Sequence, residues 1–302
     1  MIQSIFKVSV LAACLLASQV NAQSMNLKIG VAAEPYPPFT VKSASGQWTG
    51  FEVDLVNAIC KKIAAKCTIV ETSWDGIIPA LTSKKIDVIF NSMSITPERE
   101  KTIAFSAPYY YTPVVFLGGK SLKVAGIKPE DLKGKTIGTQ TSTPNADFLK
   151  KYYSKTAKIK IYNTQDEVNA DLTAGRIDLQ LADETGVYDY LKSAAGSKIE
   201  KKGLAPKDPI FGTGIGAGLR KQDADLKKKI KAADIYTCNF LLLNMGTKSS
   251  GGYYFTIENI EEMENDIIIT IKENEPKGMA TSVMTNPLAI VKINSKKNII
   301  IK

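Results

Sequence analysis

The sequence predicts an α/β protein made of two similar lobes. Short β-rich runs alternate along its 302 residues with amphipathic helical patterns, an order typical of α/β folds. An internal repeat adds to this, because residues 81–88 (LTSKKIDV) resemble residues 172–179 (LTAGRIDL) at an offset of 91 residues. Asp75 and Asp166 keep that offset at the start of the preceding helical segment. The repeat indicates two lobes built on one plan, with a chance similarity of two αβ turns as the alternative.

Hydrophobic periodicity places the individual elements. In the segment 52–66, Val53, Val56, Ile59 and Ile63 fall on one face of a helix. By the same criteria the expected strands are residues 27–31, 68–70, 86–90, 136–139, 158–162 and 177–181, and the other expected helices are 146–153, 166–174, 185–193 and 227–231.

The repeat also predicts where a ligand binds. Ser92 and Asp183 are 91 residues apart and follow the two equivalent Ile-Asp strands. Ligands of open α/β sheets bind beyond the carboxyl ends of the strands. Two facing lobes would therefore place Ser92 on one wall of a cleft and Asp183 on the other, which is the arrangement of a hinged clamp.

Composition excludes several classes of function. With 44% hydrophobic and 23% charged residues, the chain can form a folded core. It contains no histidine, which removes Ser-His and Cys-His catalysis and nearly all His-containing zinc sites. The net charge is +9, but the lysines are scattered and are not interleaved with aromatic residues, so a solvated surface is expected and no nucleic-acid partner.

The amino terminus predicts export. Residues 1–22 read as a signal peptide, with Lys7 before the 13-residue apolar stretch 8–20 and small residues before a cleavage site after Ala22. That stretch is shorter than the ~20 residues of a membrane span. A lipoprotein signal at Cys14 is the alternative. In an oxidising compartment Cys60 and Cys67 are expected to form a disulfide, since a metal site lacks further ligands. Cys238 is then the odd thiol.

Four segments supply polar or aromatic groups for the predicted cleft. The prolines of residues 34–39 (EPYPPF) hold Tyr36 in an extended loop, and Trp74 precedes a helix. Arg99 follows a short polar stretch, and residues 141–144 (TSTP) end a strand and begin a helix with free backbone N–H groups. Together with Arg99 these groups favour a carboxylate, whereas Asp183 favours an ammonium. This charge separation fits a free amino acid, although each residue alone has a purely structural explanation.

The motifs in these segments identify a resemblance. From residue 27 to residue 231 the sequence resembles the periplasmic amino-acid-binding proteins of ABC importers, especially those for lysine, arginine, ornithine and histidine. The carrying motifs are residues 36–39 (YPPF), 50–55 (GFEVDL), 74–81 (WDGIIPAL) and 94–99 (SITPER), and Cys60 and Cys67 match the disulfide of the basic-amino-acid members. The resemblance implies a two-lobe periplasmic-binding-protein (Venus-flytrap) clamp with two crossover strands, near residues 111–113 and 208–216.

The resemblance also implies roles for individual residues. Arg99 would bind the α-carboxylate with the backbone at Ser94 and Thr143, and Asp183 would take the α-amine with Ser92 and Ser94. Tyr36 and Trp74 would sandwich the ligand side chain, and Glu34 or Glu52 would meet a cationic tip. The full candidate set is Glu34, Tyr36, Trp74, Asn91, Ser92, Ser94, Arg99, Thr139, Ser142, Thr143 and Asp183. Two departures from the family are the position of Glu34, one place closer to Tyr36, and Pro144 in place of a side chain that contacts ligand.

The expected function is therefore capture of a cationic or polar L-amino acid in the periplasm and its delivery to an inner-membrane ABC permease. We expect a monomer without enzymatic activity, cofactor or metal. The alternative is an exported enzyme on the same scaffold that resembles the cyclohexadienyl or arogenate dehydratases. A ligand-sensing domain of a receptor is a third class, disfavoured because no membrane span follows the clamp.

The expected domain organisation ends in a segment that departs from the family. The ranges are 1–22 for the signal peptide, 23–111 for the first part of lobe 1, 112–210 for lobe 2, 211–233 for the return to lobe 1 and 234–302 for a divergent tail. The tail is rich in Ile, Lys and Asn and lacks the helices with which family members continue. We interpret it as the result of a changed reading frame or gene end, with a genuine appendage as the alternative.

Overall fold

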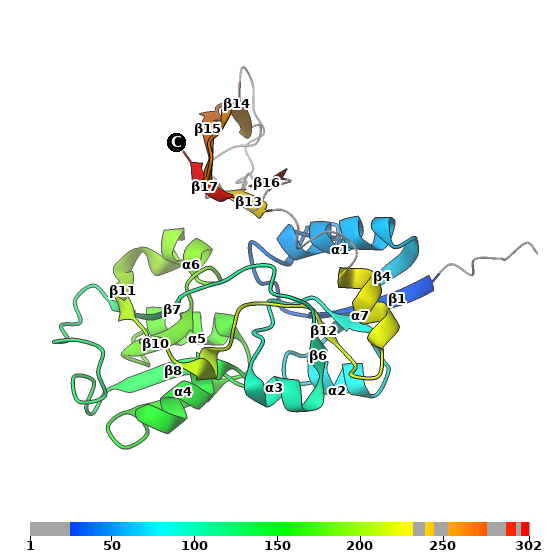
Figure 1. Cartoon of the computed structure of the whole chain (residues 1–302). Helices are drawn as coiled ribbons and strands as arrows, with labels where there is room; N and C mark the ends of the chain where they lie inside the picture. The colour runs from blue at the N-terminus through cyan, green and yellow to red at the C-terminus, as the bar shows by residue number, and fades with distance from the viewer. Residues whose placement is uncertain (1–24, 232–238, 245–252, 277–287, 294–296, 302) are drawn as a thin grey trace, which may run out of the picture.

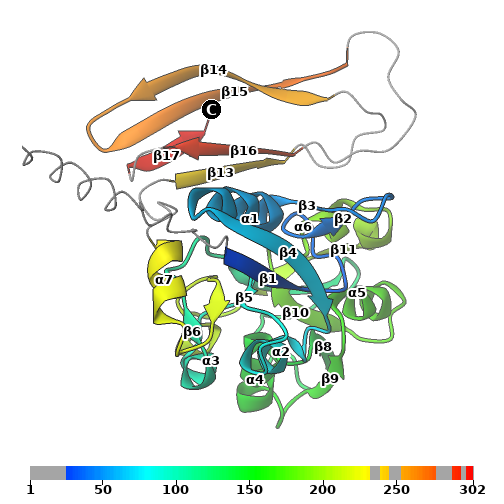
Figure 2. The same ribbon diagram turned by 90° about the vertical axis from the view of Figure 1, so that its right-hand side faces the viewer.

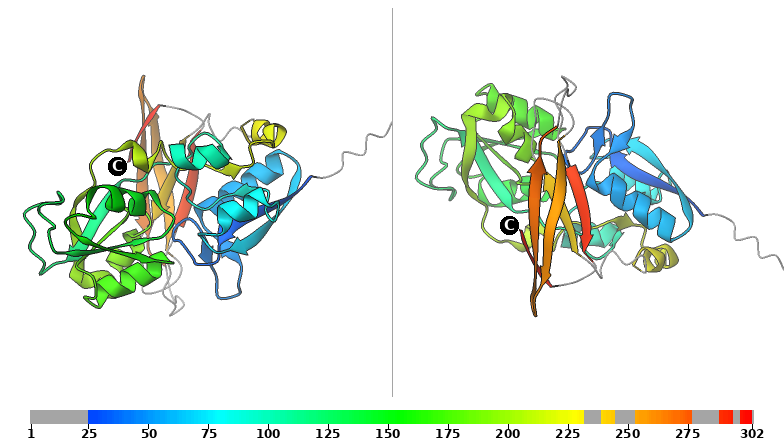
Figure 3. Two further views of the ribbon diagram at one scale, coloured as in Figure 1. Left: turned by 90° about the horizontal axis from the view of Figure 1, so that it is seen from below. Right: turned by 90° about the horizontal axis from the view of Figure 1, so that it is seen from above.

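The computed structural model describes residues 25–231, 239–244, 253–276, 288–293 and 297–301. Two five-stranded sheets with flanking helices form two lobes that lie side by side (Figures 1 and 3). The predicted two-lobe α/β clamp is therefore confirmed. Within the described ranges, no helix combines the length and the apolar character needed to cross a membrane. The predicted signal peptide and Cys238 lie outside the described residues.

Lobe 1 is built on a sheet with the strand order β4-β1-β5-β12-β6. β1 runs parallel to β4 and β5, whereas β12 is antiparallel to both of its neighbours. A two-stranded hairpin, β2-β3, belongs to the same part of the chain. The elements are β1 (Met25–Ala32), β2 (Val41–Lys42), β3 (Trp48–Thr49), α1 (Phe51–Lys62), β4 (Ala65–Thr72), α2 (Ile77–Thr82), β5 (Val88–Ile89), α3 (Pro97–Thr102), β6 (Ala104–Phe105), β12 (Gly218–Leu219) and α7 (Ala224–Lys231).

Lobe 2 has the strand order β11-β7-β10-β8-β9. β8 runs parallel to β9 and β10, and β7 is antiparallel to β10 and β11. Its elements are β7 (Val114–Gly119), β8 (Thr136–Gln140), α4 (Pro144–Tyr152), β9 (Lys158–Tyr162), α5 (Gln165–Thr173), β10 (Leu179–Asp183), α6 (Tyr188–Lys192), the 3₁₀ turns η1 (Ala195–Lys198) and η2 (Pro209–Phe211), and β11 (Ile199–Leu204). Figure 2 shows this lobe in green behind lobe 1.

The chain crosses between the two sheets twice. The first crossing lies between β6 and β7, and the second between β11 and β12. The two segments meet, because Tyr110 of the first crossing forms a bridge with Ile215 of the second. The crossings include the two segments that the resemblance implied. A pair of adjacent connections of this kind is the usual hinge of a domain closure.

Helix α1 ends earlier than its apolar pattern predicts. The sequence favours a helix to residue 66, but the helix ends at Lys62 and β4 begins at Ala65. Ala64 adopts a left-handed conformation with φ of 52°, which turns the chain into the strand. The predicted disulfide links Cys60 at the end of α1 to Cys67 in β4, with 6.2 Å between their Cα atoms. Packing of β4 against β1 thus overrides helical propensity here.

Helix α6 of lobe 2 also differs from its prediction. The segment 185–193 was expected to be helical throughout, but α6 spans only Tyr188–Lys192. The backbone N–H of Gly186 donates to the carbonyl of Asp183, so the chain makes a turn directly after β10 before the helix begins. This turn keeps Asp183 at the end of its strand, where the cleft lies.

Most of the described residues in the carboxyl-terminal part of the chain lie in strands. β13 (Asn239–Asn244) pairs antiparallel with β16 (Leu288–Ile293). β14 (Tyr254–Glu262) and β15 (Asp266–Asn274) form an antiparallel pair, and β17 (Asn298–Ile301) runs parallel to β15 (Figure 2). Ile267, Ile268 and Ile269 of β15 are buried. These elements have no counterpart in the two lobes.

Candidate ligand-binding site

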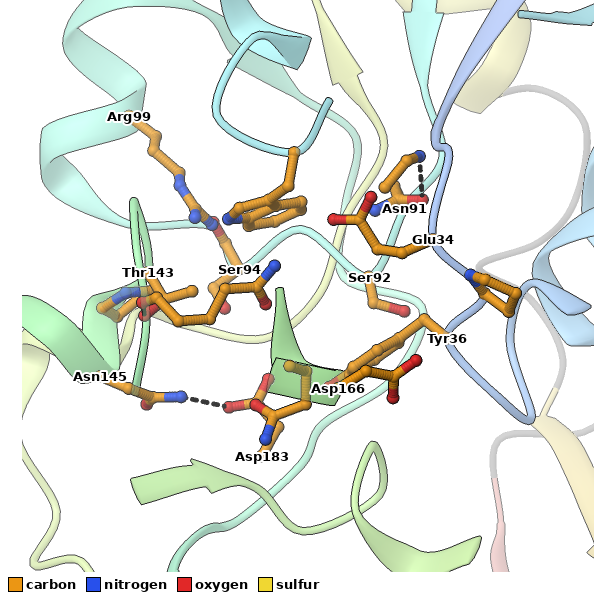
Figure 4. Close-up of a pocket in the computed structure, with 16 residues that line it drawn as sticks. Glu34, Tyr36, Asn91, Ser92, Ser94, Arg99, Thr143, Asn145, Asp166 and Asp183 are labelled. Carbon is orange, nitrogen blue, oxygen red and sulfur yellow. Dashed lines mark hydrogen bonds between the residues drawn. The ribbon is translucent and has the colours of Figure 1, made fainter. Parts of the chain in front are cut away.

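A pocket lies between the lobes, at the carboxyl ends of β1, β5, β8 and β10. In this closed arrangement its cavity volume is about 50 Å³, and the pocket is partly open to solvent. Figure 4 shows Arg99 and Asp183 entering it from different sides. Its lining consists of Ala32, Glu34, Pro35, Tyr36, Trp74, Asn91, Ser92, Ser94, Arg99, Gln140, Thr143, Pro144, Asn145, Gln165, Asp166 and Asp183.

The pocket brings together most of the residues that the sequence predicts. Only Thr139 and Ser142 of that set do not line it. Thr139 is buried in β8, where its hydroxyl donates to the carbonyl of Leu181 at 2.9 Å. Ser142 instead offers its backbone carbonyl to Arg99. The side chains that sequence reasoning did not single out include Gln140, Asn145, Gln165 and Asp166.

Arg99 is held by the local structure of lobe 1. Thr96 caps α3 by accepting a hydrogen bond from the backbone of Arg99, at 3.2 Å. The guanidinium donates from Nη1 to the carbonyl of Ser94 and from Nη2 to that of Ser142, each at 2.9 Å. It also lies over the ring of Trp74, 5.4 Å from the centroid. Burial lowers the pKa of Arg99 to about 10, so it remains a cation at neutral pH and suits a carboxylate.

Asp183 supplies the opposite charge from lobe 2. Its Oδ1 accepts a hydrogen bond from Nδ2 of Asn145 at 3.1 Å (Figure 4). The amide oxygen of Asn145 has no hydrogen-bond partner among the described residues, although this side chain is only 6% exposed. Desolvation raises the pKa of Asp183, while Asn145 and Arg99 act in the opposite direction. The carboxylate of Asp183 and the unpartnered amide oxygen of Asn145 thus lie at one end of the pocket, which suits an ammonium group.

Ser92 lines the same pocket from lobe 1, and two hydrogen bonds to the buried carboxylate of Glu52 hold it in place. Ser92 has a left-handed φ of 49°, rare for a residue other than glycine. Its backbone N–H donates to Oε1 of Glu52 at 2.6 Å and its hydroxyl to Oε2 at 3.1 Å. Tyr109 also donates its hydroxyl to Oε1. Glu52 is fully buried and does not line the pocket, so of the two acids expected at a cationic tip only Glu34 is placed there.

Glu52 gives the stability of the protein a distinct pH dependence. Desolvation raises its pKa to about 7, against the hydrogen bonds from Tyr109 and Ser92. The folded state therefore binds this proton more tightly than the unfolded state does. The resulting stabilisation is fully present below the ordinary pKa of about 4.5 and is lost as the pH rises through 7, by ~3 kcal/mol at most, at about 1.4 kcal/mol per pKa unit.

We expect Glu52→Gln, which stays uncharged, to flatten this decline. The measurement is the free energy of unfolding of ligand-free protein in urea at several pH values between about 4.5 and 8. Glu34, Asp54 and Asp183 also have raised pKa values and contribute with the same sign, so the difference between wild type and variant is the relevant quantity. Equal slopes for both proteins would contradict the assignment to Glu52.

The side walls of the pocket are aromatic. Tyr36 stacks on Phe39 with 5.9 Å between ring centroids, and Phe39 in turn stacks on Tyr110 at 4.6 Å. This packing fixes Tyr36 in its wall. Trp74 donates its indole N–H to the carbonyl of Thr141 in lobe 2, at 3.0 Å. Both rings line the pocket, as the sequence predicts.

The lobes touch each other around the pocket. Besides the bonds from Trp74 to Thr141 and from Arg99 to Ser142, the hydroxyl of Tyr36 lies against the backbone of Gly186. A Cβ added to Gly186 would lie 1.8 Å from that hydroxyl oxygen. The structure is therefore a closed clamp, and Gly186 is the residue that lets Tyr36 approach lobe 2.

We expect Gly186→Ala to lower ligand affinity by about tenfold or more, because the methyl group holds the lobes apart while each lobe stays folded. Gly119→Ala is a matched control in the same lobe, since the nearest atom to its added Cβ is 3.8 Å away. Isothermal titration and a urea denaturation curve for each variant give affinity and stability separately. Unchanged affinity in Gly186→Ala would show that the closed contact is unnecessary for binding.

Comparisons with known proteins agree with this architecture. Residues 27–234 match the family of bacterial extracellular solute-binding proteins, family 3. The chain is 38% identical over 226 residues to an L-arginine-binding protein of Pseudomonas aeruginosa, covering 74% of this chain and 86% of the relative. It is 40% identical over 215 residues to the lysine/arginine/ornithine-binding periplasmic protein of Escherichia coli K12, covering 70% of this chain and 81% of the relative.

Solved structures of binding proteins also resemble this chain. An ancestral arginine-binding protein bound to arginine has a TM-score of 0.62 and 33% identity, over 69% of this chain and 90% of the other. An ancestral amino-acid-binding protein described as a precursor of cyclohexadienyl dehydratase has a TM-score of 0.59 and 32% identity, over 69% of this chain and 87% of the other.

The two parts of the chain match two different families. Residues 240–294 match the family described as PrcB C-terminal. Through residues 27–234 the chain belongs to the bacterial extracellular solute-binding proteins of family 3.

Proposed function

We propose that this protein is a non-catalytic receptor that captures a cationic L-amino acid outside the cytoplasm and presents it to an ABC importer. The observation that carries the proposal is the placement of one cation, Arg99, and three carboxylates, Glu34, Asp166 and Asp183, around one pocket between two lobes. Arg99 suits the α-carboxylate and Asp183 the α-ammonium, which leaves two carboxylates for the side chain. A ligand with a cationic side chain balances these charges.

The kinship supports the same class of ligand. The relatives described above are named for arginine or for lysine, arginine and ornithine, and one structural neighbour holds arginine. The Escherichia coli relative is named as periplasmic, which also supports export of this chain through the predicted signal peptide. We propose a monomeric receptor whose closed form is recognised by the permease. When the lobes close around the ligand, the surface that the protein presents to a partner changes.

The experiment is a calorimetric titration of the protein after refolding to strip carried ligand. The panel is arginine, lysine, ornithine, histidine, glutamine and glutamate. We expect tight binding of at least one cationic amino acid and no binding of glutamate, whose side chain meets Glu34 and Asp166. Preference for glutamine would contradict the cationic assignment, and silence across the panel would contradict capture of an amino acid by this pocket.

The enzymatic alternative rests on the precursor of a dehydratase among the structural neighbours. Such an enzyme needs an acid or base at the leaving group, and the carboxylates that line the pocket are those of Glu34, Asp166 and Asp183. In our proposal Asp183 is occupied by the ligand ammonium, so we expect no turnover. Incubation with prephenate or arogenate, followed by chromatography, distinguishes the two functions, and loss of substrate would establish the enzyme.

We infer in addition that the tail is a separate, genuinely encoded domain. The family match over residues 240–294 and the paired strands β13–β17 support this over a changed reading frame, which would not preserve a family pattern. The test is an intact mass of the protein from its native host. A mass equal to that of residues 23–302 supports the encoded tail, whereas a product that ends near residue 234 would contradict it.

A further inference from the structure

Glu52 contacts the wall of the ligand pocket without lining the pocket itself. It stands in the first turn of α1, where its backbone N–H donates to the carbonyl of Phe39 at 3.0 Å. Its side chain is fully buried, whereas Asp54 on the same helix is exposed. The carboxylate ends next to Ser92, which lines the pocket (Figure 4). Helix α1 thus brings a buried titratable group to the back of the ligand site.

The two carboxylate oxygens of Glu52 have different surroundings. Oε1 accepts hydrogen bonds from the backbone N–H of Ser92 at 2.6 Å and from the hydroxyl of Tyr109. Oε2 faces the hydroxyl of Ser92, with 3.1 Å between the oxygens. Because two donors already engage Oε1, the place for a proton on Glu52 is Oε2, between that atom and Oγ of Ser92. Protonation of Glu52 therefore reverses the hydrogen bond between the two side chains.

This reversal changes what Ser92 offers to a ligand. When Glu52 is ionised, Ser92 donates its hydroxyl hydrogen to Oε2, and the lone pairs of Oγ act as acceptors. When Glu52 is protonated, Oγ accepts from Oε2, and its own hydrogen turns toward the pocket or toward the neighbouring hydroxyl of Tyr110. An ammonium group only donates hydrogen bonds. The ionised form of Glu52 thus suits the ligand α-ammonium, and the protonated form does not.

The groups around Glu52 leave its charge unbalanced in the ligand-free protein. The titratable groups that face it are the hydroxyls of Tyr36, Tyr109 and Tyr110, and Asp183 lies beyond them on lobe 2. Burial raises the pKa values of Tyr36 and Tyr110, so both stay neutral. Among the described residues, no Lys or Arg shifts the pKa of Glu52, which desolvation raises to about 7. An ammonium in the pocket therefore brings the positive charge that favours ionised Glu52.

We infer that Glu52 is a positioning residue that holds the hydroxyl of Ser92 as an acceptor for the ligand α-ammonium, and that protonation of Glu52 weakens ligand binding. The inference rests on the proposed function and extends it to a side chain outside the pocket lining. Since the ligand favours the ionised form, binding releases a proton, and by linkage acid lowers the affinity. The affinity is therefore lowest where Glu52 is protonated in the ligand-free protein and rises as the pH rises through 7.

The experiment is a calorimetric titration of refolded protein with arginine, lysine and ornithine at several pH values between about 5.5 and 7.5. We expect the affinity of the wild type to rise about tenfold over this range, because a single proton changes it by at most tenfold per pH unit. Glu34 and Asp183 also have raised pKa values and act with the same sign. The comparison with variants of Glu52 and Ser92 therefore decides the assignment.

Three variants isolate the hydrogen bond. In Glu52→Gln the amide oxygen takes the place of Oε1 and the amide nitrogen donates to Ser92, which reproduces the protonated form at every pH. We expect its affinity to be about tenfold below wild type near pH 7.5 and close to wild type near pH 5.5. Ser92→Ala removes the hydroxyl and should flatten the pH profile as well. Asp54→Asn is the matched control, because Asp54 is an exposed acid of α1 whose pKa is also raised. Its profile should stay within about twofold of wild type.

The outcomes separate the inference from the proposed function. Convergence of Glu52→Gln with wild type at low pH, with a flattened profile in Ser92→Ala, supports the inference. An equal loss at every pH in Glu52→Gln would assign Glu52 a purely structural role and overturn it. A profile in Ser92→Ala as steep as that of the wild type would also overturn it, and the proposed function would stand. If the wild type bound none of the three amino acids, the proposed function would fail, and the inference with it.

The wild type provides a second readout that needs no variant. Titration with the same amino acids near pH 6.5, in two buffers that differ in their enthalpy of ionisation, measures the protons released on binding. At this pH Glu52 is mostly protonated in the ligand-free protein, because its pKa is about 7. We expect binding to release part of a proton. Binding without proton release would overturn the inference even if Glu52→Gln did not fold.

Discussion

Arg99→Ala is expected to lower the affinity for the amino acid by ~2–5 kcal/mol, roughly 30- to 5000-fold in the dissociation constant. Removal of the guanidinium leaves the ligand carboxylate desolvated without its counter-charge. It also removes the hydrogen bond from Nη2 of Arg99 to Ser142, which joins the lobes at 2.9 Å. The affinity loss therefore combines weaker anion binding with weaker closure.

Two variants make the measurement specific. Arg99→Lys keeps the charge but cannot reproduce the paired bonds to Ser94 and Ser142, so we expect an intermediate affinity. Arg176→Ala removes an arginine that pairs with Asp171 in lobe 2 and does not line the pocket. Its affinity should stay within about twofold of wild type. If Arg99→Ala bound as tightly as wild type in calorimetry, Arg99 would have no role in the site.

Arg220→Leu is expected to destabilise lobe 1 by about 3–5 kcal/mol. The side chain of Arg220 is 8% exposed and connects β12 to the loop after α2. Nη1 donates to the carbonyls of Leu81 at 3.1 Å and Ile86 at 2.6 Å, and Nη2 donates to Asp87 at 2.9 Å. Nε forms an ion pair with Asp223 at 2.7 Å. A leucine removes all of these donors from a buried network, which costs more than a lost surface pair.

Both tryptophans of the chain, Trp48 and Trp74, lie in lobe 1, so fluorescence during urea denaturation reports the unfolding of that lobe. The matched control is Lys221→Met, the neighbouring cation, which is exposed and donates one hydrogen bond to the carbonyl of Lys101. We expect this control to change the unfolding free energy by less than about 0.5 kcal/mol. An equally small effect of Arg220→Leu would show that the buried network does not stabilise the lobe.

Local sequence patterns predict the elements of the lobes well, and the errors have local causes. The strand at residues 158–162 is found at Lys158–Tyr162, because its alternation and flanking turns are unambiguous. The helix predicted to residue 66 ends at Lys62, because pairing of β4 with β1 recruits residues that would otherwise extend the helix. Propensity alone does not contain that competition.

The candidate site was predictable where residue type and motif coincide. Arg99, Tyr36 and Trp74 stand in recognisable motifs, and the offset of 91 residues related Ser92 to Asp183. The same offset related Asp75 to Asp166, which is the signal that would have drawn attention to Asp166. Asn145 carried no such signal. Its importance follows from a buried amide oxygen without a partner, a property that exists only once the chain is folded.

The sequence by itself determined the two-lobe plan, the pairing of Cys60 with Cys67 and the family, because these depend on periodicity, spacing and motifs within short stretches of chain. The tertiary structure alone decided which acids line the pocket. Glu52 and Glu34 are equivalent as carboxylates in the sequence, yet Glu52 is buried beneath Ser92 while Glu34 lines the pocket. The contact of Tyr36 with Gly186 likewise joins residues 150 positions apart. Which residues line the pocket depends on how the two lobes close on each other. Closure depends on contacts between segments far apart in the sequence, so a local sequence pattern does not predict it.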